Sequence, residues 1–243
     1  MLKPPERKSL SDQVFDQLRD NILSLKFMPG EHLPSERELA DILRINRSSV
    51  REALKRLEQA RLIEIRHGEG SVVLDFTATA GFDLLRHLVT GSGRLDFIAV
   101  RSITEVRLVI ISEIARLSAL RIQEPELAGL RALTDKIAAL KNGDDAGLQK
   151  LDFEFFYALA RTSENLALVL LLNSIRDVYG QLAGHFSAMF RNADRRVYAK
   201  LCDALAAHDE SRAAELAREH MEQTNRAILA LYAEDQPNEE QVS

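Results

Sequence analysis

Several features that define common protein classes are scarce or absent in this chain, and each absence excludes a class. The single cysteine, Cys202, excludes an intrachain disulfide framework and fits a reducing cytoplasm. The longest apolar run, residues 166–172, is far too short to span a bilayer. The polar, proline-bearing N-terminus predicts no signal peptide. We therefore expect a cytoplasmic protein that does not enter a membrane.

Motifs of enzyme chemistry are missing as well. The sequence contains no Gly-rich phosphate loop, no nucleophile–base motif and no complete set of metal ligands, so we expect neither catalysis nor a cofactor.

The formal net charge of -5 argues against a uniformly basic surface for nucleic acid. At 243 residues, of which 46% are hydrophobic, the chain suits one large or two modest domains with buried cores.

The first helix of a small N-terminal head is predicted over residues 11–26, where apolar side chains recur at helical spacing. Ser9 or Ser11 can cap its start, and Pro29-Gly30 breaks the pattern beyond its end. The apolar stripe of this helix consists of Val14, Leu18, Ile22 and Leu25.

Two shorter helices follow, joined by a tight turn. Ser35 is placed to cap the second helix, with Glu38 three residues on completing a capping box. Asn46 is likewise placed to cap the third helix, whose first turn is polar and basic. Such a turn is the part of a recognition helix that enters the DNA major groove. The inward-facing residues of the two helices are Leu39, Ile42, Leu43, Val50, Ala53, Leu54 and Leu57.

The outward face of the third helix carries groups suited to DNA. Arg47 and Arg51 each offer a planar fork to guanine edges or phosphates, and the hydroxyl of Ser48 suits phosphate oxygens. We therefore expect base reading from the two arginines. Between Arg44 and Arg66, seven basic residues face three acidic ones, a local excess that attracts the DNA backbone.

Two short β-type runs, residues 62–66 and 71–74, flank a turn that contains Gly68 and Gly70. Because glycine permits positive backbone dihedrals, these runs predict a two-stranded wing with His67 facing the minor groove or the backbone. A capping box before a basic helix is common, and its bases alone most often form a solvated face. The complete ordered pattern favours DNA binding instead.

This order of motifs resembles the winged helix-turn-helix domain of the GntR family of bacterial transcription regulators. The resemblance covers roughly residues 9–76 and rests on PSERELA at 34–40, NRSSVREAL at 46–54 and RHGEGSVV at 66–73. It implies that the arginine of the first run touches DNA and that the start of the third helix reads the operator. One departure is Glu69, an acid at the wing tip, which weakens the wing contact. The DNA-binding residues that the resemblance implies are Arg37, Asn46, Arg47, Ser48, Ser49, Arg51, His67 and Gly68.

Beyond a short linker at residues 76–81, the sequence predicts helices and no strands. We expect a DNA-binding domain over 9–76, an all-α bundle of six to seven helices over 77–233 and a disordered acidic tail over 234–243. The helical segments lie near residues 80–90, 95–121, 124–141, 144–162, 164–190, 193–207 and 209–233.

Six polar side chains interrupt the apolar faces of these helices. A charged group buried without a partner costs on the order of several kcal/mol, so these groups must pair or meet a ligand. One interpretation is a polar-lined cavity that binds a ligand. The other is a buried Arg107–Asp152 ion pair, with the tyrosines hydrogen-bonded to the backbone. The six residues are Arg107, Asp152, Tyr179, His185, Tyr198 and His220.

The bundle is similar to the effector-binding domain of the FadR subfamily of GntR regulators over most of residues 78–232. Many members of that subfamily hold a divalent metal with one aspartate and three histidines. Asp152 and His220 match two of these positions, whereas Phe156 and Tyr198 occupy the other two. An Asp/His pair is a poor cage for a transition metal, so we expect no bound metal.

The same departure resembles the metal-free fatty-acid regulators of that subfamily, which bind long-chain acyl-CoA. The resemblance implies an apolar channel for an acyl chain, with Arg107, Tyr179 and His185 available to the polar head. A hydrophobic core explains the same phenylalanines equally well. The alternatives are a small organic acid bound to Arg107 and no effector at all. The channel residues would be Phe153, Phe155, Phe156, Phe186 and Phe190.

These patterns together predict a ligand-responsive transcription regulator. We expect a symmetric homodimer that binds double-stranded operator DNA with an inverted repeat, and whose DNA affinity changes when an effector binds the bundle. A purely structural dimerisation module is an alternative from another class. An enzyme is a further alternative, which the missing catalytic motifs argue against.

Overall fold

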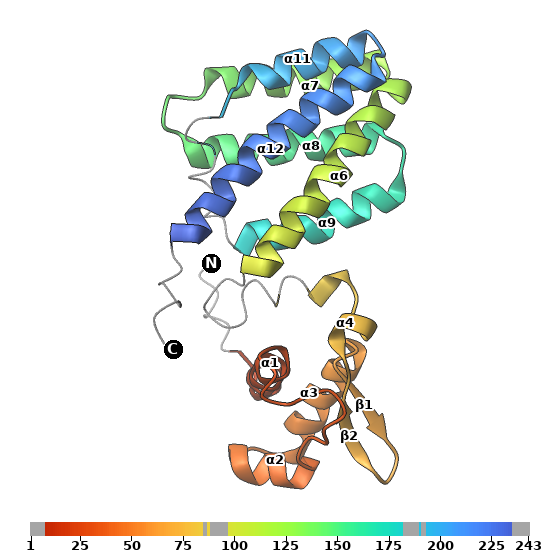
Figure 1. Ribbon diagram of the computed structural model, residues 1–243, viewed down its shortest axis with the longest axis vertical. Coiled ribbons are helices and arrows are strands. Elements are labelled where there is room, and N and C mark those ends of the chain that lie inside the picture. The colour runs from red at the N-terminus through yellow and green to blue at the C-terminus, as the bar shows by residue number, and fades with distance from the viewer. Residues whose placement is uncertain (1–7, 85–86, 88–96, 182–189, 191–192, 235–243) are drawn as a thin grey trace, which may run out of the picture. The chain divides into compact units, whose positions relative to one another are not determined.

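The computed structural model describes residues 8–84, 87, 97–181, 190 and 193–234. Its contacts divide the chain into two compact units, Met1–Arg94 and Leu95–Ser243, each of which is described by itself (Figure 1). The fold is mainly α, as predicted, and the described residues contain one two-stranded sheet. No helix within the described ranges is long and apolar enough to cross a membrane. The predicted limits of the domains and of the acidic tail stay predictions.

The first unit contains three helices followed by a hairpin, which confirms the predicted winged helix-turn-helix. The core of this unit lies between the helices and the hairpin, and each fully buried leucine or isoleucine in it contributes about 1.5 to 3 kcal/mol. The elements are α1 (Leu10–Leu23), α2 (Glu36–Leu43), α3 (Arg47–Gln59), β1 (Ile63–Arg66) and β2 (Gly70–Val73).

The predicted caps set the starts of the three helices. Ser9 and Asp12 form a capping box at α1, and Ser35 and Glu38 form another at α2. Asn46 caps α3. Each cap satisfies backbone N–H groups that have no partner within the helix, so local sequence alone is enough to fix these boundaries.

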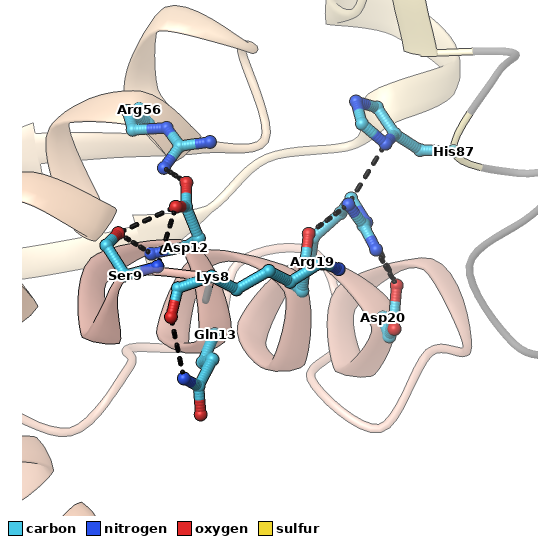
Figure 2. A network of polar contacts seen from close by, with 9 residues as sticks. Lys8, Ser9, Asp12, Gln13, Arg19, Asp20, Arg56 and His87 are labelled. Carbon is cyan, nitrogen blue, oxygen red and sulfur yellow. Dashed lines mark hydrogen bonds and ion pairs between the residues drawn. The ribbon is translucent and has the colours of Figure 1, made fainter. Parts of the chain in front are cut away.

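Helix α1 is shorter than predicted and is tied to α3. It ends at Leu23 instead of residue 26, because Leu25 adopts the left-handed conformation with a φ of +57°. Arg56 of α3 donates a hydrogen bond of 2.6 Å to Asp12 (Figure 2). The guanidinium carbon of Arg56 lies 4.4 Å from the ring centre of Phe15. The hydrogen bonds from Ser9 and Arg56 lower the pKa of the Asp12 carboxyl to about 2.

The cation of α1, Arg19, is buried and paired with its neighbours. It donates hydrogen bonds of 2.7 Å to Asp16 and to Asp20. Its Nη1 also lies 3.0 Å from Nδ1 of His87 (Figure 2). A buried cation destabilises the fold unless it is paired, and the two carboxylates provide this pairing. The contact with His87 also joins α1 to the chain that follows the wing.

The segment predicted as a linker, residues 76–81, is packed and partly helical, and this corrects the prediction. Phe76–Thr79 forms the one-turn helix α4, because the Asp75 side chain accepts a hydrogen bond from the backbone of Thr77. A 3₁₀ turn, η1 (Phe82–Leu84), follows. Leu84 is buried in the core of the first unit, and Phe76 packs against that core.

The second unit is an all-helical bundle over the described residues, as predicted. Its two longest helices, α6 (Phe97–Arg121) and α12 (Glu210–Glu234), lie side by side (Figure 1). Helices α8 and α9 pack against α6, and α11 packs against α7 and α12. The remaining helices are α7 (Glu124–Ala139), α8 (Asp145–Thr162), α9 (Leu166–Gln181) and α11 (Arg196–Ala206).

Parts of several predicted elements lie outside the described residues. They include residues 85–86 and 88–90 of the segment predicted near 80–90, residues 182–189 of the segment predicted over 164–190, and the tail beyond residue 234. His185 and Phe186 also lie outside the described residues.

Candidate DNA-binding face and buried polar cluster

The first turns of α3 separate a buried face from an exposed one. Val50 and Leu54 are buried in the core of the first unit. Arg47, Ser48 and Arg51 are exposed on the outward side. The amphipathic spacing of α3 therefore presents two guanidinium groups and a hydroxyl to solvent, as a recognition helix requires.

Asn46 holds the first turn of α3 in place. Its Oδ1 accepts a hydrogen bond of 2.8 Å from the backbone amide of Ser49 and one of 2.6 Å from the hydroxyl of Ser48. This oxygen is therefore already engaged, and its two hydrogen bonds fix the positions of Ser48 and Ser49. Amides at a helix N-terminus and serine hydroxyls are common ligands of phosphate oxygens.

Arg51 is held by a carboxylate of the neighbouring helix α2. Its Nε donates to both oxygens of Glu36, at 2.9 and 3.1 Å, and its Nη2 donates at 2.7 Å. The hydrogen bonds from Arg51 lower the pKa of the Glu36 carboxyl, and the charges of Arg47 and Lys55 act in the same direction. Arg47 itself forms no ion pair with another residue of the described chain.

The wing adopts the predicted hairpin. Arg66 of β1 pairs opposite Gly70 of β2, and Gly68 and Gly70 have φ angles of +81° and +93°. His67 and Gly68 are exposed at the tip. The acid that departs from the family pattern, Glu69, lies 3.9 Å from the guanidinium of Arg66, so its charge is partly compensated within the wing.

Arg37, on α2, is also exposed. Its Nε lies 4.0 Å from Asp41 one turn further along, at the limit of an ion pair, and 76% of its side chain is accessible. A pair at this distance on the surface contributes little to stability, so the guanidinium remains available to another partner.

In the second unit, four of the six predicted polar residues meet in one buried cluster. Asp152 of α8 accepts a hydrogen bond of 2.8 Å from the hydroxyl of Tyr198 on α11. The same carboxylate oxygen lies 2.7 Å from Nε2 of His220 on α12. Arg107 of α6 approaches the other oxygen at 3.8 Å. All four side chains are buried.

Arg107 finds its nearer partners on α12. Its Nη1 donates to the hydroxyl of Thr224 at 3.1 Å and to the side-chain oxygen of Asn225 at 3.2 Å. Asn225 in turn donates to the backbone carbonyl of Thr104 at 2.8 Å. The simple Arg107–Asp152 pair that the sequence suggested is therefore part of a larger network.

Asn225 is the functional neighbour that sequence reasoning missed. It follows Thr224 directly and so falls off the helical row that contains His220. Helices α6 and α12 are in contact along much of their length, which brings both edges of α12 within reach of Arg107. Spacing within one helix does not reveal such a contact.

One atom of the cluster has no partner. Nδ1 of His220 is buried without a hydrogen bond among the described residues. The imidazole stacks on the ring of Phe156, with ring centres 5.6 Å apart. Burial, followed by the charge of Asp152, raises the pKa of the Tyr198 hydroxyl well above its ordinary value.

Of the other predicted ligand residues, some lie outside the described residues and some are buried in the second unit. The side chain of Tyr179 and all of His185 are outside the described residues, so neither can be placed relative to the cluster. Phe155 and Phe156 are buried around Tyr198 and His220, and Phe190 is buried as well. Within the described residues, no group of three or more His, Cys, Asp or Glu side chains is arranged to hold a metal ion.

An exposed basic recognition helix with a wing, joined to an all-helical domain with a buried polar cluster, defines a DNA-binding transcription regulator with a helical effector domain. Residues 10–73 match the model of bacterial regulatory proteins of the gntR family, and residues 102–223 match the FCD domain. The chain belongs to the GntR family and, within it, to the FadR subfamily.

Individual relatives extend over most of the chain. The HTH-type transcriptional regulator Mce2R of Mycobacterium tuberculosis is 37% identical over 95% of this chain and 96% of its own. A fatty acid metabolism regulator protein of Klebsiella pneumoniae is 31% identical over 79% and 80%. The solved structure of Lar, which controls the agr system of Listeria monocytogenes, covers 95% of this chain and 100% of its own. Its TM-score of 0.57 at 18% identity shows a shared fold.

Proposed function

We propose that this protein binds an inverted-repeat operator as a homodimer and changes its DNA affinity when a long-chain acyl-CoA binds in the helical domain. The observation that carries the DNA-binding part is the exposure of Arg47 and Arg51 on a helix whose first turn is fixed by Asn46. The relatives that are fatty acid metabolism regulators support an effector derived from fatty acids. The site of action is the cytoplasm, where operator DNA is found.

On this proposal the DNA-binding residues divide by role. Arg47 and Arg51 contact base edges, and the hydroxyls of Ser48 and Ser49 contact phosphate oxygens. Asn46 positions these groups by capping the helix. The outer contacts to the DNA backbone come from Arg37, His67 and Gly68.

Coupling between effector and DNA follows from symmetry. Two heads on a symmetric dimer meet two half-sites whose spacing the duplex fixes. An effector that favours a different placement of the heads weakens the contacts at both half-sites together. The linkage is reciprocal, because DNA then weakens effector binding by the same factor.

The polar cluster is the proposed ligand site, with Arg107, Asp152, Tyr198 and His220 as its described members. Tyr179 and His185 are further candidates on the same proposal. A small organic acid is the second candidate effector, and the partnerless Nδ1 of His220 favours it. An imidazole nitrogen can accept a hydrogen bond from a carboxylic acid when neutral, or donate one to a carboxylate when protonated.

DNA binding is tested by selecting duplexes from a random library with the purified protein. Fluorescence anisotropy then compares a selected duplex with a scrambled one at several salt concentrations. The expected result is a selected sequence with two inverted half-sites, and an affinity that falls as salt rises. Equal affinity for selected and scrambled duplexes would overturn the proposal.

The effector is tested by thermal shift with long-chain acyl-CoAs and with small carboxylic acids. A compound that binds the folded state raises the melting temperature, and the effector must also change the affinity for the selected duplex. The Arg107→Gln variant should lose the response to the active class. If neither class shifts the melting temperature, the effector part of the proposal is wrong.

A further inference from the structure

The ion pair between Glu36 and Arg51 has more hydrogen bonds than its exposed position requires. The side chains are 36% and 61% accessible, and ion pairs at such positions contribute little to stability. Yet two nitrogen atoms of Arg51 engage both oxygens of the carboxylate at 2.7 to 3.1 Å. A two-point contact of this kind fixes the direction of a guanidinium as well as its position.

The acid comes from a place that is suited to hold it. Glu36 is the first residue of α2, directly after the capping Ser35. A carboxylate is favoured there by the partial positive charge at the N-terminus of the helix. The contact therefore joins the two helices of the helix-turn-helix, and it places a negative charge near Arg47 and Lys55.

The pairing limits how Arg51 can meet DNA. Its Nε–Nη2 edge is occupied by Glu36, so its Nη1 end remains for a base edge or a phosphate. Arg47 has no carboxylate partner among the described residues and keeps its whole fork. A phosphate that approaches Arg51 from the side of α2 meets the negative charge of Glu36.

We infer that Glu36 is a specificity-determining residue of the DNA-binding face. It aims the guanidinium of Arg51 at one position of the operator, and its charge weakens binding to duplexes that offer only phosphates there. The inference rests on the proposed function, because it assigns a role within DNA binding. It predicts that the protein gives up some affinity for DNA in general in return for discrimination between sequences.

The test replaces Glu36 with glutamine, which keeps the size of the side chain and removes its charge. Affinity for the scrambled duplex should rise, with a salt dependence steeper by about one ion. The ratio of affinities for selected and scrambled duplexes should fall by at least about fivefold, toward the low end of the discrimination that one base-reading arginine supplies. Melting temperature verifies that the variant is folded.

Glu52→Gln is the matched control. It removes the same charge from an exposed position of α3 that has no ion pair with another described residue. Both affinities should rise together, leaving the ratio within about twofold of the parent. If Glu36→Gln leaves the ratio unchanged, or lowers it no more than Glu52→Gln does, the inference is wrong.

Two further variants separate positioning from charge. In an Arg51→Ala background, Glu36→Gln should no longer change the ratio, because the residue acts through Arg51. Arg51→Lys keeps the cation but loses the fork, so it should lower the ratio even if Glu36→Gln proves unstable. A parent protein with no sequence preference would contradict the proposed function itself, whereas a selective parent with an unaffected Glu36→Gln variant contradicts only this inference.

Discussion

The DNA-binding face and the buried cluster of the helical domain both depend on arginine, but in opposite surroundings. Arg47 is exposed and unpaired with any described carboxylate. Arg107 is buried, and it is bonded to Thr224 and Asn225 near Asp152. An exposed cation stays available to an external partner, whereas a buried one must be satisfied by its own chain. A ligand for the cluster therefore has to replace interactions that already exist.

The largest predicted effect is on the buried side of this comparison. Asp152→Ala removes the acceptor of Tyr198 and His220 and leaves Arg107 without its nearby negative charge. We expect a loss of about 3 to 5 kcal/mol in the free energy of unfolding. Urea denaturation followed by circular dichroism measures it.

The control for that variant is Glu154→Ala, on the same helix. Its carboxylate contacts only Lys150, at 3.9 Å, among the described residues. The expected change is within about 0.5 kcal/mol, as for most surface substitutions. Equal losses from the two variants would show that the buried cluster is not a stabilising network.

For the exposed arginines of α3, substitution should change DNA recognition and leave the stability of the fold nearly unchanged. Arg47→Ala and Arg51→Ala should each cost about 1 to 3 kcal/mol of discrimination between the selected and the scrambled duplex. Their unfolding free energies should stay within about 0.5 kcal/mol of the parent, because both side chains are exposed. Variants that read the selected duplex as well as the parent would contradict the placement of the recognition helix.

A smaller effect connects stability and recognition in one residue. Asn46→Ala removes the cap of α3 and should destabilise the first unit by about 1 kcal/mol. It should also weaken binding to the selected duplex, because Ser48 and Ser49 lose their fixed positions. Asn46→Ser restores a capping oxygen and should recover most of the stability. Failure of serine to do so would argue for a different role of Asn46.

The smallest effect concerns how the free energy of unfolding falls at alkaline pH. Because burial raises the pKa of Tyr198, the folded protein keeps the phenol protonated where the unfolded chain ionises, near pH of about 10. This contribution is complete below that pH and is lost as pH rises through the folded pKa. Tyr198→Phe should flatten the fall, measured by urea unfolding between neutral and alkaline pH.

Local signals in the sequence predicted most of the fold. The capping residues Ser9, Ser35 and Asn46 act within one helical turn, so they could be recognised without knowing the tertiary structure. The end of α1 and the packed segment after the wing were predicted wrongly. The left-handed Leu25 ends α1 through local hydrogen bonds that the apolar spacing does not show, whereas the burial of Leu84 depends on contacts with other elements.

The candidate site divides in the same way. Interrupted apolar stripes identified Arg107, Asp152, Tyr198 and His220, because each lies on the inward row of its own helix. Asn225 lies off that row, so it was missed. The pairing of Glu36 with Arg51 was not foreseen either, since the two residues lie on different helices and the turn between α2 and α3 determines their contact.

The most direct test of the account is photo-crosslinking from the first turn of α3. A benzophenone amino acid in place of Ser48 should crosslink to bases of the selected duplex and much less to a scrambled one. The same group in place of Lys136, an exposed residue of α7, should give no sequence-dependent crosslink. Crosslinks of equal strength from the two positions, or none from position 48 in a complex that forms, would contradict the assignment of α3 as the recognition helix.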